Sequence, residues 1–524
     1  MARTYSTSFR LRAIAITLLL LVISGATFDP KLFVSGDNVD YLLLAQRVFQ
    51  EGEWWGSPKF PPLLPILLAP VQALFGPGFI AAKILMVLMY AATGPFLLSL
   101  AERRFRPGWA LVITLAALVS VPVVEYSHYV MSEIPFLLLS VVALALAERF
   151  LARRQEGGGR NRILPILPIA LAAGAAFYTR TIGIVLLAAF PAVLLLQRRW
   201  RAMLIAAGVC ALLLTPWIAH TARTQHEGQN YLEQVRLVNP YHPELGEIDL
   251  TGAVERLQIN GRLYFCRGIP MTAVPCTYIS SYSYLPTSDY PLPDAAGILV
   301  AAALGWGLWC SRRFLPATSA YAAAYLVVCL AWPPVWMGER FLVPLLPITF
   351  VLLASGLARL GAPLVSRWRD LRRAPAVALA IILLLAAHKL VLYAQEVPRY
   401  PTRWQAYFMA TEWARDHLAP DELVLDRKPN MFEYVTGRRA ISFPREADDE
   451  QMLAYLRRNG VTVVHVSSIP YTDVLEVLHP FMRRQITFFE HLWYGRDEPR
   501  GGYGAFLRFH PEGGLPERSE RGRD

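Results

Sequence analysis

The sequence predicts an all-α polytopic membrane protein that carries a small α/β domain at its C-terminal end. Of its 524 residues, 54% are hydrophobic and only 17% are charged, and the mean hydropathy is +0.34. The apolar residues come in blocks of about twenty, the length that crosses a lipid bilayer, and not at amphipathic spacing. Beyond Pro398 the composition changes to that of a soluble domain. These three observations set the fold class.

Eleven apolar segments are predicted to cross the membrane, most of them long enough for a hydrocarbon layer of about 30 Å. They are residues 13–29, 79–101, 108–125, 130–151, 163–179, 182–197, 202–219, 294–310, 316–333, 341–360 and 375–395. The apolar segment at 61–76 is short, proline-rich and followed by Gly76-Pro-Gly78, so we expect an interfacial or re-entrant helix there. The first segment resembles the start of a signal peptide, but an uncleaved helix is the favoured interpretation, because the acidic loop after it makes most sense tethered beside the membrane.

Arginine clusters between the apolar segments predict the orientation of the chain. With the N-terminus in the cytoplasm, these clusters fall on the cytoplasmic face, and the short outer loops hold almost nothing basic except Arg180 and Arg340. The clusters contain Arg103, Arg104, Arg106, Arg153, Arg154, Arg160, Arg162, Arg198, Arg199, Arg201, Arg312, Arg313, Arg367, Arg369, Arg372 and Arg373. The net charge of +11 therefore reflects topology signals, and no nucleic-acid partner is expected.

An odd number of spans carries the C-terminus outward, so we expect a plasma (inner) membrane protein whose C-terminal domain is extracytoplasmic. The predicted parts are a membrane domain at 1–395 with outer loops at 30–78 and 220–293, an α/β domain at 396–510, and a disordered polar tail at 511–524. In the α/β domain the pattern predicts helices at 404–418 and 448–459 and strands at 422–426 and 461–466. This domain has no Gly-rich phosphate loop, so a nucleotide site is not expected there.

The cysteines give one candidate disulfide. Cys266 and Cys276 lie in the outer loop at 220–293, where an oxidising compartment would allow them to pair. Two partly buried free thiols are the alternative, and the sequence leaves both open. Cys210, Cys310 and Cys329 lie inside apolar segments and are expected to act as small hydrophobic side chains.

Ionisable side chains gather on the predicted outer face of the membrane domain. Such groups are costly at helix ends unless they are solvated or paired, so a cluster of them on one face is the place to look for a site. They are Asp37, Asp40, Glu125, His128, Glu133, Arg180, Glu339 and Arg340. The mixture of carboxylates and arginines suggests an acid–base site beside an anion site.

Each of these residues also has a purely structural interpretation. Asp37 can cap the helix that starts near Tyr41, and Arg340 can mark a helix end by snorkelling. Glu133 can pair with an arginine for packing, and His128 is more readily explained as interfacial than as a ligand. The sequence contains no HExxH, paired CxxC or other metal-ligand spacing.

The order of several motifs along the chain resembles the GT-C glycosyltransferases, which include the protein O-mannosyltransferases and the lipid A aminoarabinose transferases. The first is Asp37-Asn-Val-Asp-Tyr-Leu-Leu-Leu-Ala45, and the second is the Pro-Pro-Leu-x-Pro helix start in Lys59-Phe-Pro-Pro-Leu-Leu-Pro65. Three later ones are Ser132-Glu-Ile-Pro-Phe136, Thr179-Arg-Thr-Ile-Gly183 and Glu339-Arg-Phe-x-x-Pro-x-x-Pro347. No single motif is diagnostic, but five in the expected order over about residues 10–395 make the resemblance specific.

The resemblance implies an enzyme that takes a sugar from a polyprenyl-phosphate carrier and transfers it to an acceptor outside the cytoplasm. By the motif match, Asp37 would be the general base that deprotonates the acceptor hydroxyl. Glu133, the second catalytic candidate, would orient the acceptor or the sugar. Relatives commonly carry another residue at the position of Asp40. We therefore count Asp40 among the substrate-binding candidates and assign it no step of the reaction.

The same resemblance implies residues that hold the donor. Arg340 is the first candidate for the carrier phosphate, because a guanidinium fork neutralises an anion bidentately, and Glu339 is placed with it among the substrate-binding residues. Arg180 is a second candidate, and Lys59 a third. Relatives often carry Lys-Pro-Pro-Leu, whereas here Phe60 intervenes, so the amine of Lys59 need not point to the same place. The prenyl tail would lie in a groove between helices that is open to membrane lipid.

Two other function classes stay open at this level. A lipid flippase or transporter usually places its ionisable residues near the bilayer midplane and shows internal repeats, neither of which this sequence displays. A membrane-anchored binding protein would work through its C-terminal domain, which has no recognisable site of its own. No cofactor is expected, although Asp37 with a second carboxylate could hold a divalent ion. The sequence does not identify the sugar or the acceptor, which could be a glycan, a lipid or a protein.

Overall fold

The computed structural model describes residues 7–34, 36–57, 59–153, 164–224, 231–274, 292–336, 338–367, 373–397, 399–445, 447–469, 471–497 and 501–513 of the 524-residue chain. These residues form two compact units. The membrane unit contains residues 7–30 and the described residues of 44–396, and the C-terminal unit contains Lys31–Leu43 and the described residues from Val397 onward. The predicted boundaries had assigned Lys31–Leu43 to the membrane domain, whereas here this segment belongs with the C-terminal residues.

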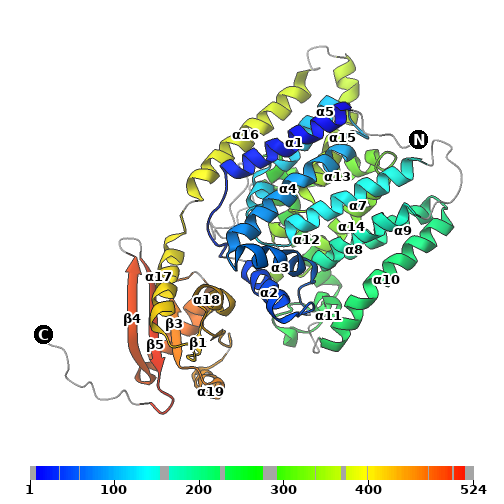
Figure 1. Ribbon diagram of the computed structural model, residues 1–524. Helices are drawn as coiled ribbons and strands as arrows, with labels where there is room; N and C mark the ends of the chain where they lie inside the picture. Colours follow the sequence, from blue (N-terminus) through cyan, green and yellow to red (C-terminus); the bar gives the residue numbers. More distant parts are fainter. Residues whose placement is uncertain are drawn as a thin grey trace. The chain divides into compact units, whose positions relative to one another are not determined.

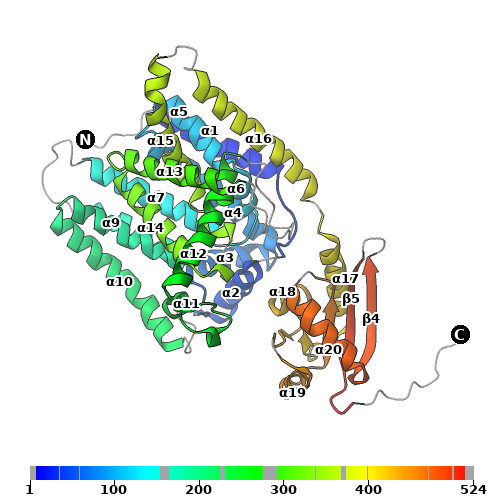
Figure 2. The ribbon, with the colours of Figure 1, turned by 180° about the vertical axis from the view of Figure 1, so that it is seen from behind.

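The membrane unit is built from helices (Figures 1 and 2). The long apolar ones are α1 (Thr7–Ala26), α4 (Phe79–Ala101), α7 (Glu133–Arg153), α10 (Trp200–Thr224), α13 (Asp294–Ser311), α15 (Leu346–Arg367) and α16 (Ala374–Glu396). Shorter apolar helices are α3 (Leu63–Phe75), α5 (Pro107–Leu118), α8 (Ile166–Thr179), α9 (Ile184–Leu196) and α14 (Pro316–Ala331). The remaining ones are α2 (Asn38–Glu51), which starts in the C-terminal unit, α6 (Val121–Tyr126), α11 (Tyr231–Arg236) and α12 (Leu250–Leu263).

The helices agree with the predicted spans in position. Each of the eleven predicted segments contains a helix, with α5 and α6 together in the segment 108–125. Within the described residues, seven helices are long and apolar enough to cross a membrane. The multi-pass architecture is therefore confirmed, while the count of eleven spans stays a prediction. The segment at 61–76 forms α3, and its expected interfacial or re-entrant placement also stays a prediction.

Small residues set how closely some of these helices pack. In α13, a Cβ added to Gly307 would lie 2.3 Å from the carbonyl oxygen of Leu352 in α15, so only glycine allows this backbone contact. Interhelical packing of this kind replaces the hydrophobic effect between helices that lie in lipid. A buried ion pair adds to it, because Lys83 of α4 lies 3.5 Å from a carboxylate oxygen of Asp29, just beyond α1, and donates to its carbonyl at 2.8 Å.

The C-terminal unit is an α/β domain with one five-stranded sheet. Its strands are β1 (Val424–Leu425), β2 (Ala440–Ile441), β3 (Val463–Ser467), β4 (Phe489–Asp497) and β5 (Gly502–Phe509), in the order β2-β1-β3-β5-β4. The first three are parallel to one another, and the β4–β5 hairpin is antiparallel to β3. Its helices are α17 (Thr402–His417), α18 (Pro429–Thr436), α19 (Asp449–Asn459) and α20 (His479–Arg484).

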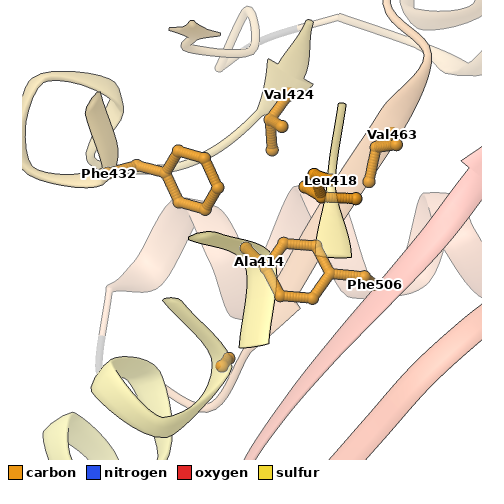
Figure 3. Packing of buried hydrophobic residues seen from close by; sticks show 7 residues of the cluster. Ala414, Leu418, Val424, Phe432, Val463 and Phe506 are labelled. Atoms are coloured by element: carbon orange, nitrogen blue, oxygen red, sulfur yellow. The ribbon is translucent and has the colours of Figure 1, made fainter. Parts of the chain in front are cut away.

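The core of this domain lies between α17, α18 and the sheet. Figure 3 shows Ala414 of α17, Phe432 of α18 and Phe506 of β5 among the buried side chains that meet there. The predicted helix at 448–459 is present as α19, with a complete capping box in which Asp448 and Gln451 bond each other's backbone N–H. The other predicted elements are present as α17, β1 and β3, whereas α18, β2 and the β4–β5 hairpin were not predicted.

Candidate functional site

Three of the predicted site residues meet in the membrane unit, and we call them the Glu133 cluster. Glu133 is the first residue of α7 and is fully buried. Nη1 of Arg180 donates to its Oε1 at 2.5 Å, and Nε of Arg340 donates to the same oxygen at 3.0 Å. Arg180 also donates to the hydroxyl of Ser132 at 3.1 Å. The cluster therefore joins residues that lie 47 and 207 positions apart in the sequence.

Local backbone geometry places Arg180 in this cluster. It lies in an extended break between α8 and the 3-10 turn η1 (Thr181–Gly183), with φ −148° and ψ 132°. The chain then folds back so tightly that a Cβ on Gly183 would lie 2.6 Å from the backbone of Phe177. Any larger residue at position 183 would displace this turn. The Thr-Arg-Thr-Ile-Gly motif thus has a physical reason, because glycine permits the turn that presents the arginine.

Aromatic residues support the second arginine. Arg340 lies in the 3-10 turn η7 (Glu339–Phe341), whose last carbonyl accepts a 2.7 Å hydrogen bond from the hydroxyl of Tyr325 in α14. The guanidinium carbons of Arg180 and Arg340 lie 5.5 and 5.7 Å from the centroid of the Phe341 ring, within cation–π range. The ring therefore holds the two guanidinium groups on a shared apolar surface.

The contacts of the Glu133 cluster centre on one carboxylate. Two guanidinium groups face it, and the Oε2 atom of Glu133 is buried with no hydrogen-bond partner among the described residues. Exposure differs between the members, since the side chain of Arg340 is 26% exposed, that of Arg180 is 10% and that of Glu133 is 0%. Two neighbouring guanidinium groups, one of them partly exposed, are forked donors of the kind that bind anions.

The two predicted aspartates lie in the C-terminal unit. Asp37 directly precedes α2, is half-buried, and its carbonyl accepts the backbone N–H of Tyr41 at 3.2 Å, as expected of a residue at a helix start. Asp40 lies in the first turn of α2, and its carboxylate accepts a hydrogen bond from the side-chain amide of Asn430 in α18. Asp40 therefore links α2 to the α/β domain, a role that the sequence did not predict.

The remaining two candidates are Lys59 and Glu339. Lys59 is exposed, and its ammonium group lies 4.7 Å from the ring centroid of Phe60, the residue that interrupts the family's Lys-Pro-Pro-Leu pattern. Glu339 belongs to η7, but its side chain lies outside the part of the chain that the structure describes.

His128 was expected at the interface, but it is fully buried. Its Nε2 atom lies 2.9 Å from the hydroxyl of Ser24 in α1, and its ring stacks on Tyr393 of α16 at an interplanar angle of 12°. Glu125 is also buried, and its Oε1 accepts a 2.5 Å hydrogen bond from Tyr129. Helices that are distant in the sequence cover these groups, so local polarity did not predict their burial.

The described residues show no metal site and do not test the candidate disulfide. No group of three or more His, Cys, Asp or Glu side chains lies close enough to hold a metal ion among the residues that are described. Cys266 is buried, with its sulfur 4.0 Å from Asp294 Oδ1, whereas Cys276 lies outside the described residues. The disulfide stays a prediction.

Comparisons with known proteins identify the fold of this chain. No family model and no curated protein matches the sequence. The structure is similar to ArnT from Cupriavidus metallidurans bound to undecaprenyl phosphate, with a TM-score of 0.56 and 14% identity over 96% of this chain and 98% of that one. It is also similar to the archaeal oligosaccharyltransferase AglB from Archaeoglobus fulgidus in complex with an inhibitory peptide and a dolichol-phosphate, with a TM-score of 0.54 and 14% identity over 95% of this chain and 74% of that one.

Both structural relatives belong to the GT-C superfamily and are polytopic membrane proteins. At 14% identity the likeness establishes the fold. The predicted resemblance to GT-C proteins is therefore confirmed at the level of the fold.

Proposed function

We propose that this protein is a glycosyltransferase of the plasma (inner) membrane, which moves a sugar from a polyprenyl-phosphate-linked donor to an extracytoplasmic acceptor. The observation that carries the proposal is the Glu133 cluster, where Arg180 and Arg340 meet at one buried carboxylate at 2.5 and 3.0 Å and the side chain of Arg340 is 26% exposed. A carrier phosphate is the anion such a pair binds. The proposal is supported by structural relatives that hold undecaprenyl phosphate and a dolichol-phosphate.

Within the Glu133 cluster, the two arginines have different roles in the proposal. Arg340 is the more exposed and binds the carrier phosphate directly, while the nearly buried Arg180 orients Glu133. Glu133 holds the guanidinium of Arg340 in place before the donor arrives, which lowers the entropy lost when the phosphate binds.

The proposed reaction is a single displacement at the anomeric carbon. The acceptor oxygen forms a bond to this carbon while the bond from the carbon to the carrier phosphate oxygen breaks, and the electron pair leaves with the phosphate. Asp37 accepts the proton of the acceptor hydroxyl. A carboxylate suits this step because its negative charge also favours the oxocarbenium-like transition state. Asp37 directly precedes α2 and is half-buried, so its side chain is partly open to solvent.

The test is a transfer assay with purified polyprenyl-phosphate sugars and cell-envelope extracts as the acceptor source. For Asp37→Asn we expect a loss of turnover on the order of a hundredfold, because a general base contributes about that much. For Arg340→Ala we expect weaker use of the lipid donor. The matched control is Arg262→Ala, since Arg262 forms an exposed ion pair with Asp294 on a predicted outer segment.

Four outcomes would contradict parts of the proposal. An Asp37→Asn variant that keeps more than about a tenth of the activity is not missing its base. Unchanged donor dependence in Arg340→Ala would remove this residue from the phosphate site. Movement of labelled lipid-linked sugar across vesicles without any transfer product would identify a transporter, and sugar released to water without an acceptor would identify a hydrolase.

A further inference from the structure

A group of basic side chains lies in the C-terminal unit, where the three parallel strands end. Arg427 and Lys428 follow β1, Arg445 follows β2, and Tyr471 and Asp473 follow β3. We call these five residues the basic edge. Because β2, β1 and β3 are parallel neighbours, the loops after them emerge at the same side of the sheet. In open α/β sheets this side, at the carboxyl ends of the strands, is where ligands bind.

The side chains of the basic edge contact one another. Nε of Arg427 donates to Asp473 at 2.7 Å, and Nε of Arg445 lies 3.2 Å from the same carboxylate. The ring centroid of Tyr471 lies 4.5 Å from the guanidinium of Arg427 and 5.3 Å from the ammonium of Lys428. Two guanidinium groups thus share one carboxylate, and the ammonium group of Lys428 lies near the neighbouring ring. The side chain of Arg445 is 53% exposed, so part of this positive charge faces solvent.

The acidic residues that follow Arg445 have other partners. Asp448 caps α19. Asp449 forms a two-bond ion pair with Arg484 at 2.7 and 2.8 Å, which lowers the pKa of Asp449 to about 2. Both carboxylates are therefore held by helix-capping or pairing contacts of their own.

A buried carboxylate fixes the first of these loops. Asp426, which directly precedes Arg427, accepts the backbone N–H of Lys428 at 2.5 Å and contacts Nδ1 of His465 at 2.5 Å. It also accepts a 3.3 Å hydrogen bond from the hydroxyl of Tyr407. Burial raises the pKa of Tyr407 well above its usual value, and Asp426 raises it further. The loop is therefore held before any ligand binds, which is how a protein preorganises a binding site.

The basic edge lies beside the segment that carries the proposed base. Asn430, two residues after Lys428, donates to the carboxylate of Asp40, and Asp40 lies three residues after Asp37. All of these residues belong to the C-terminal unit. The basic edge and the first turn of α2 are thus linked through the short segment from Lys428 to Asn430.

We propose that the basic edge binds the phosphate or carboxylate group of an anionic glycan acceptor and so presents its hydroxyl to the segment of Asp37. The inference rests on the proposed function. Arg427 and Arg445 supply forked donors for the anion, and Lys428 supplies a third cation. The donor is the less fitting occupant, because its phosphate is attached to a prenyl chain and the C-terminal unit has no long apolar helix among its described residues.

The test measures binding to the full-length protein in phosphatidylcholine nanodiscs. The probes are a synthetic disaccharide with one phosphate monoester and the same disaccharide without it. We expect the phosphorylated probe to bind at least about tenfold more tightly, and Arg445→Gln and Lys428→Gln each to reduce that preference several-fold. The matched control is Arg508→Gln. Arg508 is 45% exposed and pairs with Glu422, which precedes β1, and it lies beside Val463 at the start of β3, on the opposite side of the sheet.

Equal binding of the two probes, or an equal loss in Arg508→Gln, would overturn the inference. A preference that disappears when phosphatidylglycerol replaces phosphatidylcholine would assign the basic edge to a lipid headgroup instead. In the transfer assay, the inference expects Arg445→Gln to raise KM for an anionic acceptor, and an equal rise in KM for the donor would contradict it. If no donor supports transfer, the proposed function fails while the binding result still reports on the basic edge.

Discussion

The Glu133 cluster of the membrane unit and the Asp426 contacts of the C-terminal unit are both organised by one buried carboxylate. Glu133 contacts two guanidinium groups, and one of them, Arg340, is 26% exposed. Asp426 contacts His465, Tyr407 and a backbone N–H, and both side chains are buried. The first arrangement has a partly exposed guanidinium group, whereas the side-chain partners of the second are buried. A buried carboxylate is therefore a candidate for a binding site when one of its partners reaches the surface.

The contacts of Glu133 and Asp426 should also differ in how much they contribute to stability. Breaking a buried ion pair by removing one partner costs about 3–5 kcal/mol, since the remaining charge is left without compensation. A cluster with one exposed member loses less, because water solvates what remains. We therefore expect substitutions at the Asp426 contacts to act on stability and substitutions at Arg340 to act on the donor.

The largest expected effect is that of Asp426→Ala. The substitution removes the acceptor of His465, of Tyr407 and of the Lys428 N–H, so we expect the C-terminal unit to lose about 3–5 kcal/mol of stability, because each buried donor left without an acceptor costs about 1–3 kcal/mol. Hydrogen exchange of β1 and β3 peptides in the full-length protein measures the loss. Asp416→Ala, at an exposed pair with Arg415, is the control. Unchanged protection in Asp426→Ala would show that these contacts do not hold the domain together.

The next effect separates the two arginines of the Glu133 cluster. Arg180→Ala removes the partner that is only 10% exposed, and we expect it to lower the stability of the membrane unit by about 2 kcal/mol, seen as a lower Tm in detergent. Arg340→Ala should lower Tm less and raise KM for the donor about tenfold, as expected for a lost charge-assisted contact. The reverse pattern would mean that the two arginines have been assigned to the wrong roles.

A smaller effect is expected at Ser132. Its hydroxyl accepts a 3.1 Å hydrogen bond from Arg180, so Ser132→Ala removes one contact and leaves the ion pair with Glu133 intact. We expect a loss of about 1 kcal/mol, measured by the same Tm series. An effect as large as that of Arg180→Ala would show that the hydroxyl, and not Glu133, positions this arginine.

The smallest effect is a pH dependence of the C-terminal unit. Burial lowers the pKa of His479 below its usual value of about 6.5, and Arg483 contributes to the shift. The unfolded chain therefore takes up the proton first, so the stability from this group is complete above about pH 6.5 and is lost as the pH falls toward the folded pKa.

Hydrogen exchange near β3, corrected for the intrinsic rates, measures this dependence in the full-length protein. The effect should be absent in His479→Gln, which keeps a donor for the carbonyl of Ser467 that His479 contacts at 3.1 Å. An equally steep loss below pH 6.5 in that variant would assign the dependence to another group.

The helices of the membrane unit and four elements of the α/β domain, α17, β1, α19 and β3, were readable from local patterns. An apolar segment in lipid must satisfy its backbone internally, so hydropathy over about twenty residues predicts a helix without knowledge of its neighbours. The capping box of α19 is likewise local. The β4–β5 hairpin was missed because its stability comes from pairing with β3 across the sheet, with a register shift between His491 and Trp493 that no local pattern indicates.

For the candidate site, the sequence by itself determined which residues carry charge on one predicted face, and it named Glu133, Arg180 and Arg340 before their contact was known. Only the tertiary structure decided which of them pair. The structure also decided that Asp40 bonds Asn430, 390 positions away, and that Asp426 lies against His465. The physical reason is that burial and ion pairing depend on the groups that surround a side chain, and distant segments supply those groups only after the chain has folded.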